Sequence, residues 1–260
     1  MLKILKYSFF DLMRSRWSYI YFLFYLLLGF VLFFLNNDVS KAVITLLNII
    51  IVLTPLIGTI FGVMYYYSSR EFTELLLSQP LKRSTIFLGQ YLGVALSLSL
   101  SLVIGLGIPF VAYGVTRSSA IWDFTSLLVT GSFLTFIFVA LAYNIALSFN
   151  DKIKGFGFAI LMWLFMAVIY DGIIMVLMMN YQEYPLDKFA LGAMMLNPID
   201  LSRILILLKL DISALLGYTG AVFQKFFGTS LGMLVSMGVL SIWVLLPLLR
   251  ITRMAKKKDF

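Results

Sequence analysis

The segment Ser68-Ser-Arg-Glu-Phe-Thr-Glu-Leu-Leu-Leu-Ser-Gln-Pro-Leu-Lys-Arg83 is a short charged stretch between two long apolar runs, at residues 42–67 and 84–113. A helix of about 20 apolar residues is long enough to cross the hydrocarbon core of a bilayer. Of the 260 residues, 62% are hydrophobic and 12% are charged, whereas soluble domains carry about 25% charged residues. The sequence therefore predicts an integral membrane protein in which the charged stretch connects two membrane-spanning helices.

The charged stretch itself predicts a short helix. Ser68 and Glu71 have the spacing of a capping box, in which a hydroxyl and a carboxylate bond to the free amides at a helix start. Phe72, Leu75 and Leu76 recur at helical spacing on one face, and a proline ends the helix. Two interpretations remain open from this pattern: an ordinary capped turn between spans, or a surface that receives force from a soluble partner.

The whole chain, residues 1–260, is expected to form one all-α transmembrane domain with six spans. Residues 96–102 alternate Leu and Ser like a strand, but an open strand cannot satisfy its backbone in lipid, so this segment is predicted to be helical. The predicted spans are residues 17–35, 42–67, 84–113, 124–149, 155–181 and 227–249.

Residues 1–16 carry apolar side chains on one helical face and lysines on another. This pattern is typical of an interfacial elbow helix that lies in the membrane surface, although a plain basic flank would also fit. A cleaved signal peptide is not expected, because the apolar run that follows is long enough to span the membrane.

The basic residues predict the orientation, because Lys and Arg are enriched in cytoplasmic loops. We place the N-terminus in the cytoplasm, which leaves most of the 20 Lys and Arg residues on that side. The exceptions on the other side are Lys41, Arg117, Lys188, Arg203, Lys209 and Lys225. Both termini and the charged stretch at 68–83 are therefore expected to be cytoplasmic.

The sizeable extracytoplasmic segment is predicted at residues 183–225. Asn197 and Pro198 read as an N-cap followed by proline at the first helical position. Asp200 lies in the first turn, where a carboxylate meets the positive end of the helix, and Arg203 follows three residues later. We expect an amphipathic helix that rests on the outer face of the bundle before the last span.

Composition excludes several kinds of chemistry. The sequence has no Cys and no His, so disulfides, thiol catalysis, histidine acid–base chemistry and structural zinc sites are not expected. It also lacks G-x-x-x-x-G-K-[ST], so ATP, if it drives this protein, is hydrolysed on another polypeptide. The net charge of +8 is explained by basic residues beside the spans, and no nucleic-acid binding is predicted.

Asp171 is the only charged residue within the predicted spans, and an unpaired charge there is costly. It is either part of a pathway or gate, or it lies close enough to the outer surface to reach the headgroups. Met175, Met178 and Met179 follow it; thioethers suit Cu(I), but methionine is also a common packing residue. Without His or Cys beside them, these methionines predict no definite metal site.

The run from Arg70 to Pro80 resembles the cytoplasmic loop after the second span of ABC-2 transporter permeases. In that family the loop forms a coupling helix that docks on a separate ATPase subunit, and the family often has a glycine where Phe72 stands here. The resemblance implies ATPase-docking residues Arg70, Glu71, Phe72, Thr73, Glu74, Leu75 and Leu76.

Residues 196–203 and 210–221 resemble the outer segment of NosY-type permeases, the ABC-2 subfamily needed to mature the copper sites of nitrous oxide reductase. The resemblance implies a homodimer in the bacterial inner membrane, two cytoplasmic ATPase subunits that bind ATP and Mg²⁺, and a periplasmic copper-binding β-helix protein. The implied contacts with that protein are Asn197, Pro198, Asp200, Arg203, Gly217 and Tyr218. A generic ABC-2 exporter of lipid, drug or peptide remains the alternative; a secondary transporter would be expected to carry more charged residues inside the membrane.

Overall fold

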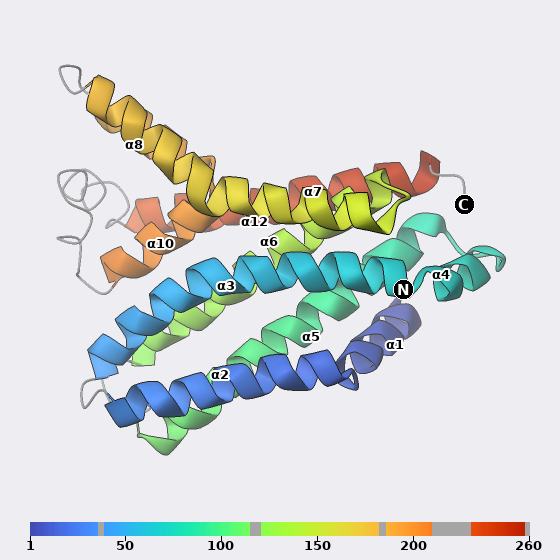
Figure 1. Cartoon of the computed structure of the whole chain (residues 1–260), viewed down its shortest axis with the longest axis horizontal. Coiled ribbons are helices and arrows are strands. Elements are labelled where there is room, and N and C mark those ends of the chain that lie inside the picture. Colours follow the sequence, from blue (N-terminus) through green and yellow to red (C-terminus); the bar gives the residue numbers. More distant parts are fainter. Residues whose placement is uncertain (36–38, 115–120, 182–185, 210–229, 258–260) are drawn as a thin grey trace.

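A computed structural model of the chain describes residues 1–35, 39–114, 121–181, 186–209 and 230–257. All regular secondary structure in these residues is helical, and six helices are long and apolar enough to cross a membrane (Figure 1). The predicted all-α membrane fold with six spans is confirmed.

The six spans are α2, α3, α5, α6, the continuous helix formed by α7 and α8, and α12. The helices lie in the order α1 (Leu2–Met13), α2 (Arg16–Leu35), α3 (Val39–Ser68), α4 (Arg70–Leu77), α5 (Arg83–Ala112), α6 (Ile121–Ser148), α7 (Lys152–Leu164), a π-helical turn (Phe165–Ile169), α8 (Tyr170–Asn180), α9 (Asp187–Met195), α10 (Pro198–Lys209) and α12 (Ser230–Lys257).

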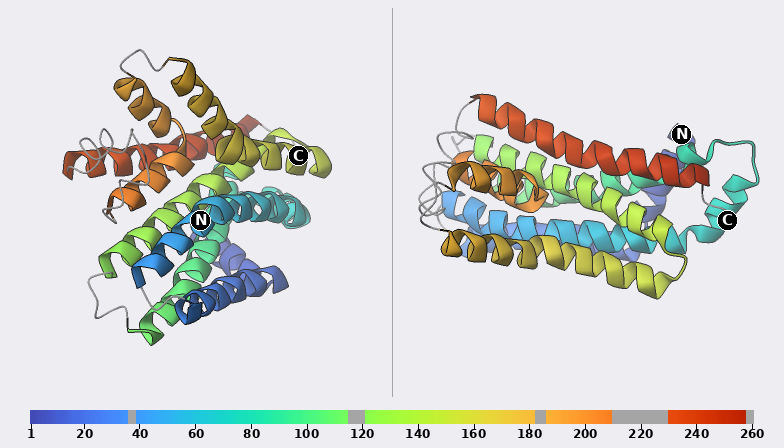
Figure 2. Two further views of the ribbon diagram at one scale, coloured as in Figure 1. Left: turned by 60° about the vertical axis from the view of Figure 1, so that its left-hand side comes forward. Right: turned by 90° about the horizontal axis from the view of Figure 1, so that it is seen from above.

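α5 and α6 form the centre of the bundle, and most of their residues are buried. α3 and α12 pack on α6, and α1 and α2 pack on α5. Small residues permit the close approaches: a Cβ added to Gly62 of α3 would lie 2.7 Å from the Cβ of Ala142 in α6. Seen from above, α12 and α7–α8 lie at opposite edges of the bundle (Figure 2). The fifth span is the most peripheral, because Gly155 and Ala159 are its only buried residues.

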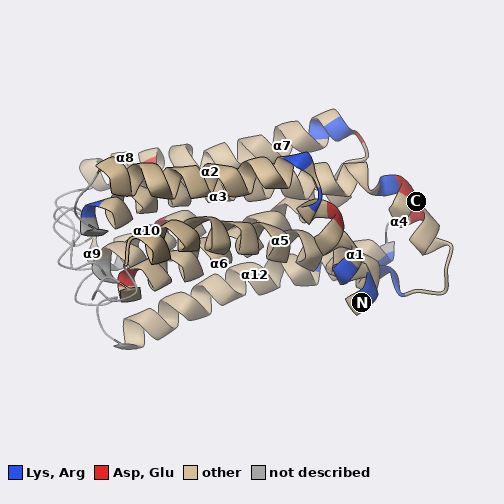
Figure 3. Ribbon diagram, turned by 90° about the horizontal axis from the view of Figure 1, so that it is seen from below, with Lys and Arg blue, Asp and Glu red and all other residues tan. Residues whose placement is uncertain are grey.

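The charged residues gather at one end of the bundle. Lys and Arg cluster where α1, α4, the start of α7 and the end of α12 lie together (Figure 3). The segments that we predicted to share the cytoplasmic side therefore do share one end of the molecule, while the assignment of that end to the cytoplasm stays a prediction.

α1 lies against α5 at this end. A Cβ added to Gly93 would lie 2.6 Å from the Cβ of Ser8, so glycine is needed for α1 to approach this closely. Leu2, Tyr7 and Phe10 remain exposed on the other side of α1. These apolar side chains are consistent with a helix at the membrane surface, and the interfacial role of α1 remains a prediction.

The predicted capping box is wrong. α3 continues as a regular helix to Ser68, so the next helix starts later, at Arg70, with Ser69 as its N-cap and no side-chain cap bond. The Ser68 hydroxyl instead donates to the carbonyl of Tyr65, 3.2 Å away. The sequence pattern fits a cap, but Ser68 is itself the last residue of α3, so the N-cap position falls one residue later, on Ser69.

The predicted placement of the outer amphipathic helix is also wrong. α9 and α10 form a pair bent by 110°, and α10 is buried on several sides rather than resting on an outer surface. Trp243, near the middle of α12, donates from Nε1 to the carbonyl of Met195 at 3.2 Å, so the bend reaches into the membrane-spanning part of the bundle. The buried residues of α10 include Ile199, Leu201, Ser202, Ile204 and Ile206.

Candidate functional site

The fifth span changes its helical geometry beside the α9–α10 bend. α7 passes into the π-helical turn at Phe165–Ile169, and α8 follows without a break. Single π-helical turns occur frequently at functional sites, because they interrupt the regular hydrogen bonding of an α-helix. Here the carbonyl of Met166, inside the turn, accepts a hydrogen bond from Asn197 Nδ2 at 2.8 Å.

Asn197 is the residue that holds the bend. Its Oδ1 accepts from the amide of Ile199 at 3.1 Å, which confirms the predicted N-cap, and Pro198 occupies the first position of α10 as predicted. Its Nδ2 also donates to Asp200 Oδ2 at 2.8 Å. Because Asn197 is only 1% exposed, these bonds connect the start of α10 to the fifth span in a dry environment.

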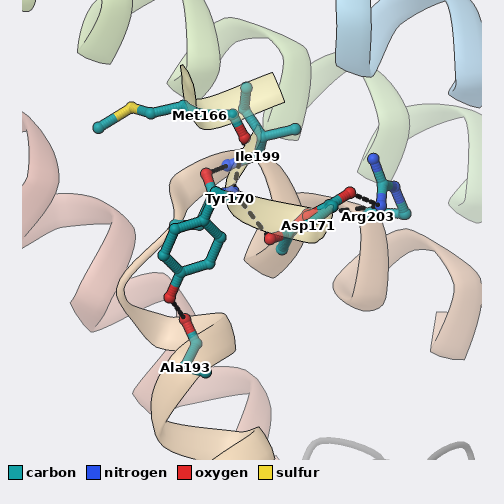
Figure 4. A network of polar contacts seen from close by, with 8 residues as sticks. Met166, Tyr170, Asp171, Ala193, Ile199 and Arg203 are labelled. Carbon is teal, nitrogen blue, oxygen red and sulfur yellow. Dashed lines mark hydrogen bonds and ion pairs between the residues drawn. The ribbon is translucent and has the colours of Figure 1, made fainter. Parts of the chain in front are cut away.

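The charged candidate Asp171 lies one turn further along the same span. Its Oδ2 is 2.9 Å from Arg203 Nη1, and the same nitrogen lies 3.4 Å from Asp200 Oδ1 (Figure 4). The neighbouring Tyr170 hydroxyl donates to the carbonyl of Ala193 at 2.6 Å. The α8 segment is therefore linked to both arms of the bend, by an ion pair to α10 and a hydrogen bond to α9.

The position of Asp171 along the fifth span indicates why its charge needs a partner. Asp171 lies nine residues before the end of α8 at Asn180, which corresponds to roughly 13 Å of helix. Both side chains are partly exposed, 37% for Asp171 and 32% for Arg203, at a depth where this span is predicted to pass through the hydrocarbon core. In such surroundings an unpaired charge is costly, so Arg203 stabilises two carboxylates that would otherwise repel each other.

Two tryptophans tie this region to other spans. Trp163, two residues before the π-helical turn, donates from Nε1 to the carbonyl of Val52 in α3 at 3.2 Å. Trp243 of α12 holds the other side of the bend through Met195. Sequence reasoning missed both contacts; a tryptophan inside a predicted span is the only signal that pointed to them.

The methionine candidates are not gathered around Asp171. Met175 and Met179 are 65% and 59% exposed on α8, so they face outward, whereas Met178 packs partly buried against the core. No group of three or more Asp or Glu residues that could hold a metal ion occurs in the described part of this His- and Cys-free chain. The pathway role of the methionines stays a prediction.

At the opposite end, α4 is held on the bundle by two contacts. The ring of Phe72 stacks on Tyr7 of α1 with a centroid distance of 4.4 Å. The hydroxyl of Thr73 accepts from Gln90 Nε2 of α5 at 2.8 Å and donates to the carbonyl of Ser69 at 2.8 Å. Thr73 and Gln90 are both buried, so α4 is attached to α5 by a polar contact that water does not reach.

The other side of α4 is exposed. Glu71 and Glu74 face outward, Arg70 pairs with Glu74 at 3.0 Å, and Leu75 is 67% exposed. Sequence reasoning placed Phe72, Leu75 and Leu76 on one face; the structure turns Phe72 toward α1 and Leu75 away from the bundle. The free surface of α4 is thus acidic with one exposed leucine.

The residues predicted to contact an outer protein fall into two groups. Asn197, Pro198 and Asp200 are buried inside the chain, where they hold the bend, and Arg203 is half-buried in the ion pair with Asp171. Gly217 and Tyr218 lie outside the described residues. Contact between this segment and an outer protein stays a prediction.

Six spans, a short helix attached at one end and a bent helix pair inserted at the other define a multi-pass membrane protein of the permease type. Residues 5–218 match the model of the ABC-2 family transporter protein, and the chain belongs to this family, whose members are membrane subunits of ABC transporters.

Two relatives narrow the comparison, and both are described as probable ABC transporter permease protein NosY. The chain is 28% identical to the protein from Stutzerimonas stutzeri over 136 residues, which covers 50% of this chain and 49% of the relative. It is 26% identical to the protein from Pseudomonas aeruginosa over 185 residues, which covers 68% of this chain and 67% of the relative. The chain thus spans about half of the first relative and two thirds of the second.

Proposed function

We propose that this chain is the membrane subunit of an ABC transporter in which α4 docks on a separate cytoplasmic ATPase. The observation that carries the proposal is the division of α4 into two sides. Phe72 and Thr73 attach the helix to α1 and α5, while Glu71, Glu74 and Leu75 remain exposed for a partner. The complex is proposed to be a homodimer of this chain with two ATPase subunits, each binding ATP and Mg²⁺.

The same contacts supply a route for movement through the membrane. A displacement of α4 acts on α5 through Thr73 and Gln90, and on α3, which precedes it directly in the chain. α3 is joined to the fifth span by Trp163 and Val52, and that span is joined to the α9–α10 bend by Asp171 and Asn197. The two ends are coupled if ATP and an outer ligand each favour one arrangement of this route over the other.

The outer end is proposed to act on a periplasmic copper-binding β-helix protein that serves the maturation of nitrous oxide reductase. Similarity to the NosY permeases supports this assignment. A generic ABC-2 exporter of lipid, drug or peptide is the alternative, since it needs α4 but no dedicated outer partner. Co-purification of a soluble periplasmic protein, lost when residues 210–229 are replaced by a Gly/Ser linker, is expected for the first function and not for the second.

Docking on α4 is tested by exchanging the character of its exposed side. The double variant Glu74→Lys/Leu75→Glu should leave the permease folded, because both side chains face away from the bundle, yet abolish its stimulation of the ATPase. The matched control is Ile153→Lys/Lys154→Glu, which changes an exposed aliphatic and an exposed charged residue at the start of α7, at the same end of the molecule. Normal ATPase stimulation by the α4 variant, or an equal loss in the control, would contradict docking at α4.

A further inference from the structure

An apolar groove of about 500 Å³ runs along the edge of the bundle formed by α12. α6 supplies its floor, α12 one wall, and the tip of the α9–α10 bend closes it near the middle of α12. The apolar lining includes Leu141, Met195, Leu196, Val239, Ile242 and Leu246.

The groove is built by two side-chain bonds rather than by loose packing. Asn144 Nδ2 of α6 donates to the carbonyl of Pro247 in α12 at 2.9 Å, which fixes the distance between floor and wall. Trp243 Nε1 fixes the bend to the same helix through the carbonyl of Met195 at 3.2 Å. Both Asn144 and Trp243 line the groove themselves.

One end of the groove carries a positive charge. Among the described lining residues Arg250 is the only charged one, and it lies toward the end of α12 where Arg253 and Lys256 follow. Within the described part of the chain, Arg250 takes part in no ion pair. The lining residues that the structure describes include no carboxylate, so they offer a partner for a phosphate and none for an ammonium group.

The length of the groove matches one leaflet of a bilayer. From Val239 to Arg250 the lining follows 12 residues of α12, or about 16 Å of helix. The hydrocarbon core is about 30 Å thick, so one leaflet contributes about 15 Å. A chain that begins at the surface beside Arg250 would therefore end beside Leu196 at the tip of the bend.

We propose that this groove binds one anionic phospholipid, with an acyl chain against α6 and α12 and the phosphate on Arg250. The lipid belongs to the leaflet at the α4 end of the molecule. It contacts Leu196, the exposed neighbour of Asn197, and so lies next to the bend without being part of its polar network. The proposal is independent of ATPase docking at α4.

Trp243 is a built-in reporter for this lipid. The variant Trp17→Phe/Trp122→Phe/Trp163→Phe retains Trp243 alone, and it is reconstituted in phosphatidylcholine nanodiscs that contain brominated lipid at a fixed fraction. Brominated phosphatidylglycerol is expected to quench Trp243 with about a fivefold preference over brominated phosphatidylcholine, since one basic residue at a membrane surface favours an anionic lipid by about this factor.

Two charge substitutions separate the groove from the general effect of a basic tail. Arg250→Gln should bring the preference close to one, whereas the matched Arg253→Gln, one turn further along and outside the groove, should leave it near fivefold. An equal loss in both variants, or equal quenching by the two lipids in the parent, would mean that ordinary surrounding lipid is observed and would overturn the proposal. Absence of quenching by either lipid would also overturn it, because a second copy of the chain would then cover the groove.

Native mass spectrometry of the unsubstituted protein provides a check that does not depend on removing tryptophans. Protein released from phosphatidylglycerol-containing nanodiscs is expected to retain one phosphatidylglycerol. Arg250→Gln should lose it and Arg253→Gln should keep it; retention in both variants would contradict the assignment.

Discussion

Arg203 lies between two carboxylates, Asp171 at 2.9 Å and Asp200 at 3.4 Å. The three side chains do not contribute equally, because the guanidinium is the one cation between two carboxylates. Asp200 still accepts from Asn197 if Asp171 is removed. If Arg203 is removed, two acidic groups are left facing each other in surroundings that are poor in water.

We therefore expect Arg203→Gln to destabilise the protein more than Asp171→Asn. The loss of the cation should cost about 1–3 kcal/mol, the usual range for a buried polar group left without its partner. Adding Asp200→Asn to Arg203→Gln should recover part of the loss, because it removes one of the two facing carboxylates. The stabilities of the three variants are compared by thermal unfolding in detergent, with tryptophan fluorescence as the signal. An equal or larger effect of Asp171→Asn would show that Arg203 does not hold the cluster.

The α9–α10 bend and α4 show how short helices are positioned by single polar contacts on the spans. α10 begins at a side chain, Asn197, that caps its own helix and also donates to the π-helical turn of the fifth span. α4 is joined to α5 through Thr73 and Gln90. Each helix is too short to be stable on its own, since isolated helices below about 12–15 residues are marginal in water.

Asn197 has two roles, capping α10 through its oxygen and donating through Nδ2, and two substitutions separate them. Asn197→Ser keeps an oxygen that can cap α10 but removes Nδ2, which donates to the carbonyl of Met166 and to Asp200, so it should cost about 1–3 kcal/mol. Asn197→Ala should cost about 1 kcal/mol more, because the cap is lost as well. Unfolding midpoints of the two variants provide the comparison. Wild-type stability of Asn197→Ser would mean that the bond to the π-helical turn contributes nothing.

We expect the contact between α4 and α5 to be needed for passing movement from the ATPase to the spans, and not for binding of the ATPase to α4. Thr73→Val preserves the shape of the side chain but removes the hydroxyl that Gln90 donates to. We expect the partner ATPase to bind this variant normally and to be stimulated less, because movement of α4 is no longer passed to α5. The measurement is ATPase binding and turnover with the same preparation; lost binding would show that docking itself depends on the attachment of α4 to α5.

The molecule as a whole has two unlike ends. The end with α1 and α4 carries most of the described basic residues, and the other end carries the α9–α10 bend beside the spans (Figure 3). Basic residues next to spans favour the cytoplasmic side. This asymmetry leads to the expectation that α4 meets a cytoplasmic ATPase.

Single cysteines test that orientation, and the chain has none of its own to remove. Leu75 of α4 and Leu35 at the end of α2 are leucines of nearly equal exposure, 67% and 69%, at opposite ends of the molecule. In intact spheroplasts a membrane-impermeant maleimide should label Leu35→Cys and should label Leu75→Cys only after the membrane is opened. The reverse pattern would place α4 outside and rule out its contact with a cytoplasmic ATPase.

The number and type of the spans follow from the sequence, because an apolar run of about 20 residues has few ways to satisfy its backbone in lipid other than as a helix. The same reasoning identified residues 96–102 as helix in spite of their alternating pattern, and the structure places them in α5. The start of α10 was also predictable, since capping by Asn197 and the preference for Pro198 are local effects.

Only the tertiary structure decided which side of each helix packs against the other helices and which side faces outward. Asp171 and Arg203 are 32 positions apart, and Trp163 and Val52 are 111 apart, so no local pattern joins them. The burial of α10 was missed for the same reason. In water, an apolar face marks the inside of a protein; in a membrane, lipid is as apolar as the core, so the hydrophobic pattern no longer distinguishes the two.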